Sequence, residues 1–76
     1  MIKILFFANL REEIGASINY DCTKCTVQEV MRYVERLYPQ VSLSSTMVAI
    51  NEQFASSVDC VNAGDVVAFL PPVSGG

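Results

Sequence analysis

Runs of apolar residues separated by polar turns organise this chain. Residues 2–8 (IKILFFA), 47–51 (MVAIN) and 66–70 (VVAFL) are apolar at most positions, whereas residues 16–22 (ASINYDC) alternate around Ile18 and Tyr20. Alternation is typical of a half-exposed strand, and a short continuous apolar run is typical of a buried one. The pattern therefore predicts four strands, and we expect residues 53–57 (QFASS) to pair back briefly on the third.

A helix is the most regular predicted element. Its apolar positions recur every three or four residues and form one stripe, made of Val27, Val30, Met31, Val34, Leu37 and Tyr38. Thr26 and Glu29 have the spacing of a capping box, in which each side chain accepts a hydrogen bond from a free backbone N–H. Pro39 ends the helix near Tyr38, because the residue before a proline avoids the helical conformation.

Polar segments predict the connections. Residues 9–15 (NLREEIG) read as a polar turn, residues 40–46 (QVSLSST) as a loop, and residues 61–65 (VNAGD) as a turn in which Gly64 adopts positive φ. The first two strands are joined by a short connection, so we expect them to pair antiparallel. The element order predicts a two-layer α+β domain with one long helix on one face of one sheet.

One helix leaves one sheet face uncovered. Residues 2–8 and 66–70 are nevertheless apolar at positions that point to both faces. We expect Phe7, Phe54 and either Phe69 or Leu70 to form an exposed apolar patch on the uncovered face. Such a patch usually marks a protein interface.

Composition narrows the classes of function. The 76 residues suffice for one domain, with 51% hydrophobic residues and a net charge of −3. Five Lys and Arg residues cannot form a basic stripe, which argues against nucleic acid as a partner. The chain has no histidine, and so lacks the commonest general base and metal ligand. We expect no self-contained enzyme. The absence of a signal peptide pattern and of a long apolar segment predicts a cytoplasmic protein away from membranes.

The three cysteines raise the question of metal or redox chemistry. Cys22 and Cys25 have the C-x-x-C spacing found in redox pairs and zinc sites, and Cys60 is the third. Zinc sites and iron–sulfur clusters generally need four ligands, and no histidine is present to complete the set. We predict no metal site and interpret the thiols as structural, with a redox role as the alternative.

The C-terminal segment FLPPVSGG carries the most specific functional signal. Pro71 and Pro72 favour an extended chain, so residues 71–76 are expected to form a tail leaving a domain of residues 1–70. The tail then tapers through Val73 and Ser74 to Gly75 and Gly76. Without Cβ atoms, a partner can approach the glycine backbone closely. We infer that the carboxyl group of Gly76 is the reactive group and that the domain is held by a partner.

The sequence resembles the small, sulfur-carrying subunits of molybdopterin synthase, which are ubiquitin-like β-grasp proteins. The resemblance rests on IKILFFANLRE at the start, VAIN in the middle and GDVVAFLPPVSGG at the end. It implies a mixed sheet and a cycle in which an ATP-using enzyme adenylates Gly76. A sulfur donor then leaves a thiocarboxylate there. The large synthase subunit uses that sulfur to build the dithiolene of molybdopterin, and the carrier itself binds no cofactor.

The same resemblance assigns roles to individual residues. Gly76 is the modified residue, and the segment that enters the partner's channel consists of Pro71, Pro72, Val73, Ser74 and Gly75. Leu70 and Phe54 belong to an apolar docking face, to which we add Phe7 from the uncovered-face argument, and Arg11 is a polar contact. Family members often carry an aromatic residue in place of Leu70 and threonine in place of Ser74.

Two other functions remain open from the residues. The chain could carry sulfur for another product, such as thiamine, with the same tail chemistry. It could instead be a ubiquitin-like protein modifier, or an interaction domain whose terminus is inert. The Pro-Pro exit favours the molybdopterin synthase family over a carrier for another product, and a search for the terminal thiocarboxylate by mass spectrometry separates both from the modifier.

Overall fold

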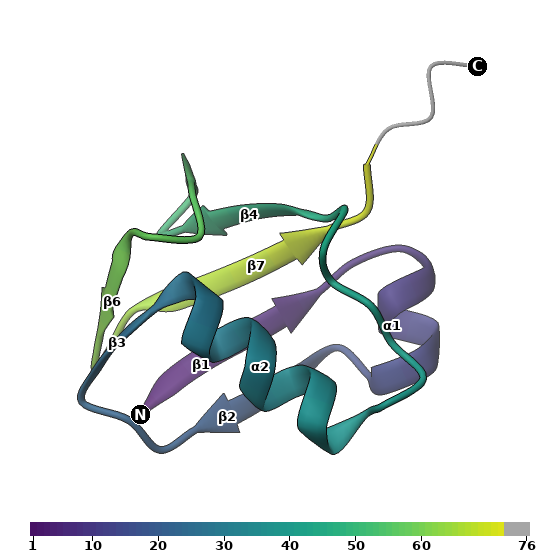
Figure 1. Ribbon diagram of the computed structural model, residues 1–76, viewed down its shortest axis with the longest axis horizontal. Helices are drawn as coiled ribbons and strands as arrows, with labels where there is room; N and C mark the ends of the chain where they lie inside the picture. The colour runs from purple at the N-terminus through teal and green to yellow at the C-terminus, as the bar shows by residue number, and fades with distance from the viewer. Residues whose placement is uncertain (73–76) are drawn as a thin grey trace.

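The computed structural model describes residues 1–72 as a five-stranded sheet with a long helix across one face (Figure 1). The strand order is β2-β1-β7-β4-β5, with bounds Ser17–Tyr20, Ile2–Phe6, Val66–Leu70, Met47–Ile50 and Gln53–Ala55. β1 and β7 are parallel, and the other neighbouring pairs are antiparallel. The helix is α2, Val27–Leu37. This is the mixed-sheet, ubiquitin-like β-grasp that the sequence predicted, including the short return strand β5.

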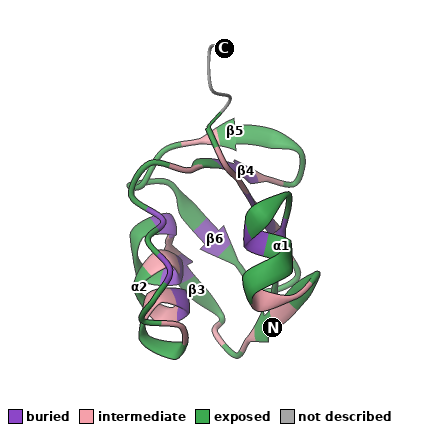
Figure 2. Ribbon diagram, turned by 90° about the vertical axis from the view of Figure 1, so that its right-hand side faces the viewer, coloured by how far each residue is buried: buried purple, intermediate pink, exposed green. Residues whose placement is uncertain are grey.

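The hydrophobic core lies between the sheet and α2. Alternate residues of β1 and β7 point toward the helix and are almost fully buried, and the buried set on these strands is Ile2, Ile4, Phe6, Val67 and Phe69. The rings of Phe6 and Phe69 stack with centroids 6.1 Å apart. In Figure 2, α2 is buried on the side that meets the sheet and exposed on its outer side. Phe69 therefore belongs to the core, and its assignment to the uncovered face is wrong.

The boundaries of α2 follow the predicted signals closely. The Thr26 side chain accepts a hydrogen bond from the Glu29 backbone N–H, and the Glu29 carboxylate accepts one from the Thr26 backbone N–H, so the capping box is confirmed. Tyr38 caps the other end. Leu37, however, is 50% exposed. Val41 and Leu43 in the following loop are buried instead, and the Leu43 backbone N–H donates to the Glu35 carboxylate at 2.8 Å.

Two parts of the structure differ from the sequence prediction. Residues 9–15 were predicted as a turn, but they contain a six-residue helix, α1 (Asn9–Ile14), because Leu10 is buried and anchors it to the core. The segment around Cys60 forms a second, two-stranded sheet, in which β6 (Cys60–Asn62) pairs with β3 (Lys24–Thr26). Gly64 follows β6 with φ 92°, so its predicted positive φ is confirmed, whereas Val61 and Asn62 belong to β6 rather than to the predicted turn. Within residues 1–72, no helix has the length and apolar character needed to span a membrane.

Candidate functional site: an apolar sheet face beside the C-terminal segment

The sheet face turned away from α2, the open face, is apolar across four strands. Its residues are cross-strand neighbours: Leu5 lies beside Ala68, Ala68 beside Ala49, and Ala49 beside Phe54. Met47 lies beside Leu70 in the next row. The apolar residues of the open face are Leu5, Met47, Ala49, Phe54, Val66, Ala68 and Leu70, and Lys3 lies beside Val66 at the start of β1. Strand alternation places these side chains opposite to the core residues of the same strands.

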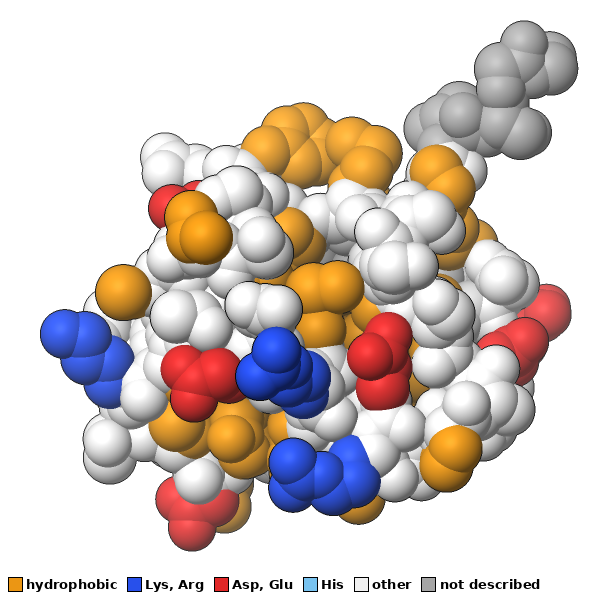
Figure 3. Space-filling model, viewed as in Figure 1, with side chains coloured by type: hydrophobic (Ala, Val, Ile, Leu, Met, Phe, Trp, Pro, Cys, Tyr) orange, Lys and Arg blue, Asp and Glu red, His pale blue; other side chains and the backbone are white. Residues whose placement is uncertain are grey.

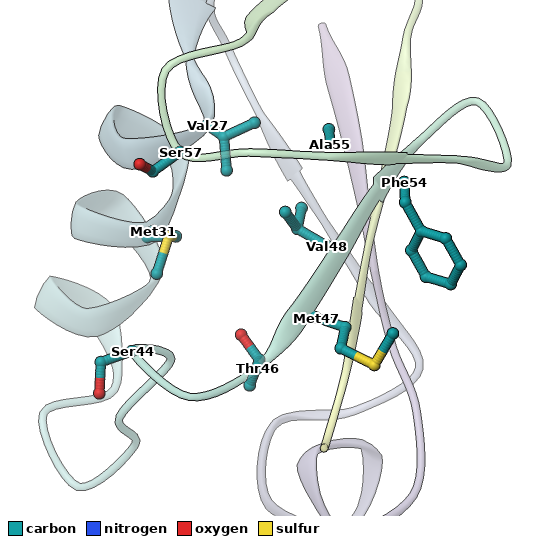
Figure 4. A pocket seen from close by; sticks show the side chains of 9 residues that line it. All are labelled: Val27, Met31, Ser44, Thr46, Met47, Val48, Phe54, Ala55 and Ser57. Carbon is teal, nitrogen blue, oxygen red and sulfur yellow. The ribbon is translucent and has the colours of Figure 1, made fainter. Parts of the chain in front are cut away.

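Exposure on the open face is concentrated in a few large side chains. Phe54 is 74% exposed and Met47 39% exposed, whereas Leu70 is half-buried. Figure 4 shows the side chains of Phe54 and Met47 on the far side of β4 and β5 from those of Val48 and Ala55, which lie on the α2 side. Figure 3 shows hydrophobic side chains gathered along the molecule's edge over β4. An aromatic ring this exposed is available for contact with another protein.

A shallow hollow of about 550 Å³ occupies part of the open face. Its lining combines strand residues with a turn and with the segment after β1, and comprises Leu5, Phe7, Asn51, Glu52, Val66 and Ala68. Phe7 is 40% exposed at its rim. A second hollow of about 380 Å³ lies between α2 and β4–β5 and is lined partly by Met31, Val48 and Phe54 (Figure 4).

The C-terminal segment begins at the edge of this face. β7 ends at Leu70, which pairs with Met47. Pro71 is half-buried and Pro72 is exposed. Val73, Ser74, Gly75 and Gly76 lie outside the described residues, so the roles predicted for them remain predictions.

Arg11 lies near the same end of the sheet. β1 and β7 are parallel with Phe6 beside Phe69, so the residues that follow the two strands emerge together. Phe7 and α1 continue from β1 (Figure 1), and Arg11, which belongs to α1, is exposed. Arg11 is therefore on a helix rather than in the predicted turn. Ala8, which precedes α1, has φ 54° and ψ −132°, a conformation that side-chain-bearing residues rarely adopt.

A polar network holds the turn at the other end of the open face. Asn51 and Glu52 both have positive φ in the β4–β5 turn. The Asn51 amide accepts from the Val66 backbone N–H at 2.9 Å and donates to the Asp65 carboxylate at 3.1 Å. The Asn62 backbone N–H donates to the same carboxylate, and these hydrogen bonds lower the pKa of Asp65. The network joins the β4–β5 turn to the start of β7.

None of the three cysteines lies on a strand of the five-stranded sheet. Cys25 is buried beside α2, and burial, with a smaller contribution from a hydrogen bond to Cys22, raises its pKa to about 12. The Cys22 thiol donates to the Lys24 carbonyl oxygen at 3.3 Å, and Cys60 is exposed. In the described part of the chain, no three His, Cys, Asp or Glu residues come close enough together to hold a metal ion. Burial therefore keeps the Cys25 thiol protonated at neutral pH, and a protonated thiol is a poor nucleophile.

Sequence comparison identifies the family. The ThiS family model matches residues 4–76. A molybdopterin synthase sulfur carrier subunit from Dictyostelium discoideum is 35% identical, covering 97% of this chain and 94% of its own. One from Escherichia coli (strain K12) is 31% identical, with full coverage of both chains.

Solved structures agree with this assignment. The small archaeal modifier protein 1 (SAMP1) from Methanosarcina acetivorans matches with a TM-score of 0.80 and 25% identity over 99% of this chain and 95% of that one. Subunit 1 of the molybdopterin-converting factor from Helicobacter pylori 26695, solved in complex with subunit 2, matches with a TM-score of 0.65 and 20% identity over 99% and 97% of the chains.

This chain belongs to the ThiS family, a class of β-grasp sulfur carriers. Within that class, the two relatives that match it along almost their whole length are sulfur carrier subunits of molybdopterin synthase, which confirms the resemblance carried by the three sequence motifs.

Proposed function

We propose that this chain is the sulfur carrier subunit of a molybdopterin synthase and that the Gly76 carboxyl group carries the sulfur. A carboxylate is a poor electrophile, so an activating enzyme first uses ATP to convert it to an acyl adenylate. Attack by a sulfur donor displaces AMP and leaves a thiocarboxylate. This soft nucleophile then delivers sulfur to a pterin precursor in the active site of the large subunit, where the dithiolene forms.

The chemistry of the chain supports a carrier that depends on its partners. It contains no histidine, the side chain that most often serves as a general acid or base. The three cysteines are all free, which suits the reducing cytoplasm. General acids, bases and ATP therefore belong to the activating enzyme and the large subunit.

The open face supports a docking role. Phe54, Met47 and Leu70 form an apolar surface immediately before the tail. A partner that binds this surface receives the tail at a defined place, which raises the effective concentration of Gly76 in its active site. The H. pylori relative of known structure is bound to subunit 2 of its own converting factor. We propose a homologous large subunit as the partner here, with Phe7 and Arg11 at the rim of the contact.

The observation that carries this proposal is the full-length match to molybdopterin synthase carrier subunits. It is tested by mass spectrometry after incubation with the activating enzyme, ATP and a sulfur donor. We expect a species about 16 Da heavier, from replacement of oxygen by sulfur at Gly76. Deleting Gly76, or adding a residue after it, should abolish that species and dithiolene synthesis by the large subunit. Unchanged synthesis after either edit would contradict the proposal.

A protein modifier is the second candidate, and the 25% identity and TM-score of 0.80 with SAMP1 favour it specifically. A modifier would join Gly76 to lysine side chains of other proteins rather than deliver sulfur. Tagged protein expressed with its own activating enzyme distinguishes the two. Isopeptide-linked conjugates without any thiocarboxylate would establish the modifier function and remove the sulfur-carrier proposal.

A further inference from the structure

The edge strand β2 carries unpaired backbone groups. The Lys3 backbone N–H donates to Asp65, on the β7 side, and the Phe6 backbone N–H donates to Ala16, on the β2 side. Backbone groups alternate in direction along a strand, so Ile2 and Ile4 also bond toward β2. The backbone N–H and C=O groups of their partners, Tyr20 and Ile18, therefore point toward β1. It follows that the backbone N–H and C=O groups of Ser17 and Asn19 point out from the sheet.

This edge lacks the usual protection against strand addition. β2 has the sequence SINY, with no proline, no charged residue and no glycine. Such an edge can accept a further strand. Within residues 1–72, a long hydrogen bond of 3.5 Å runs from the Tyr33 hydroxyl to the Asn19 carbonyl oxygen on this edge. The Tyr33 ring is held by stacking on Tyr20, with centroids 4.1 Å apart.

A basic cleft lies directly beside the edge. It has a volume of about 180 Å³ and is lined by Tyr20, Glu29, Arg32, Tyr33 and Arg36. Arg32 and Arg36 are four residues apart on α2 and so share one helix face. The Glu29 carboxylate, which accepts hydrogen bonds from the Thr26 backbone N–H and hydroxyl, also lines the cleft, so the two guanidinium groups exceed it by one positive charge. Figure 3 shows basic side chains over α2 with acidic side chains beside them.

The charge of the cleft contrasts with the charge of the chain. Two of the five Lys and Arg residues meet here, in a protein of net charge −3. Tyr20 points toward the α2 side of the sheet, so alternate side chains of an added strand would face Tyr33 and the arginines. Carboxylates at those positions would lie close to the guanidinium groups, which bind carboxylates through bidentate hydrogen bonds.

We propose that the β2 edge and the Arg32–Arg36 cleft form a second docking surface, which binds an extended acidic peptide segment of another protein by strand addition. Main-chain hydrogen bonds to Ser17 and Asn19 supply affinity, and the arginines select acidic side chains. The surface lies at the opposite edge of the sheet from β5 and is separate from the open face. A partner can therefore hold the carrier here while the tail remains available.

The test is titration of the isotope-labelled full chain with a synthetic eight-residue peptide of alternating Val and Thr flanked by glutamates, followed by NMR. We expect saturable shifts of the Ser17 and Asn19 amide resonances and slower hydrogen exchange at both. Replacing Arg32 and Arg36 together by alanine should weaken binding about tenfold, whereas Lys24→Ala, an equally exposed cation elsewhere, should not change it. Ser17→Pro removes an outward N–H that β1 does not use, and should weaken binding about fivefold.

Three results would overturn the proposal. One is a lysine-flanked version of the peptide binding as tightly as the glutamate version. Another is shifts confined to Met47 and Phe54, which would place the peptide on the open face. The third is concentration-dependent pairing of β2 between copies of this chain without peptide, which would make a second copy the occupant. Deleting Gly76 should leave peptide binding unchanged, so failure here is distinguishable from failure of the sulfur-carrier function.

Discussion

The two faces of the central sheet carry the same kinds of apolar residue but differ in how far those residues are buried. On β7, Val67 and Phe69 are fully buried against α2, while Val66, Ala68 and Leu70 remain partly exposed. On β5, Ala55 faces the core side and Phe54 is 74% exposed. The hydrophobicity of a residue does not decide whether it is buried here. One face is buried because α2 packs on it and excludes water.

The comparison shows how a small carrier divides its apolar residues. One face stabilises the fold, and we propose that the other is kept for contact with partners, which would explain why β1 and β7 are apolar at positions facing both sides. A domain this small has a free energy of unfolding of about 4–11 kcal/mol. Large losses of packing on the face covered by α2 would therefore unfold it. Substitutions on the two faces should therefore separate stability from association.

The sharpest test compares two phenylalanines. Phe69→Ala removes a fully buried ring that stacks on Phe6, and it should lower the free energy of unfolding by about 3–5 kcal/mol. Phe54→Ala removes an exposed ring and should change it by no more than about 0.5 kcal/mol. Urea denaturation of both variants measures the difference. Equal losses would show that the open face also contributes to stability.

Association should respond in the reverse order. Phe54→Asp or Leu70→Asp places a charge in the proposed interface, and each should weaken binding to the large synthase subunit at least about thirtyfold, the effect expected of an interface hot spot. Gln53→Asp adds the same charge on the neighbouring residue of β5, on the opposite side of the strand, and serves as the control. Isothermal titration calorimetry measures the affinities. Unchanged affinity for both open-face variants would remove the open face from the interface.

Substitutions of Asn51, in the β4–β5 turn, should have a smaller effect on the free energy of unfolding. Asn51→Ala removes the hydrogen bonds to Val66 and Asp65 and places alanine at φ 50°, which should cost about 2 kcal/mol of unfolding free energy. Asn51→Gly loses the same hydrogen bonds without the backbone strain, so about half of that loss should remain. Thermal unfolding of the two variants separates the contributions. An Asn51→Gly variant as unstable as Asn51→Ala would show that backbone strain is unimportant here.

The smallest effect concerns pH. Hydrogen bonds from Asn62 and Asn51 lower the pKa of Asp65 in the folded chain, so the unfolded chain binds its proton more readily. The resulting stability is fully present above the unfolded pKa of about 3.9 and is lost as pH falls through the lower, folded pKa. Compared with Asp65→Asn, the unaltered chain should be more stable at pH 6, and the difference should shrink toward pH 2.5. A difference that stays constant across this range in urea titrations would contradict the role of the carboxylate.

Some elements could be predicted from the sequence because their signals are local. The capping box of Thr26 and Glu29, the period of α2 and the positive φ of Gly64 depend on residues close together in the chain. The α1 helix was missed because its six residues are polar except for Leu10 and Ile14, and a short helix needs tertiary anchoring. β3 and β6 were missed because three-residue strands show too little alternation, and each forms only against the other.

The residues of the candidate sites likewise divide into those that the sequence could predict and those that depend on tertiary structure. Phe54 was predicted as exposed because one helix can cover only one face. The choice between Phe69 and Leu70 depended on the register of β7, and a shift of one residue exchanges the two faces. The outward direction of Ser17 and Asn19 and the arginines beside them had no sequence signal, because they depend on which strand ends up at the edge.

The sequence by itself determined a two-layer α+β domain, the position of α2 and the surplus of apolar residues, which depend on periodicity and on local chemistry that a linear chain contains. The β-grasp class came from the resemblance to a known family, carried by the motifs that end in Gly75 and Gly76. Only the tertiary structure decided which residues of β7 are buried, which strand forms the edge beside Arg32 and Arg36, and how Asn51 joins two turns. Those features arise from contacts between residues distant in the chain, whose geometry is set when the strands pair and α2 packs on one side.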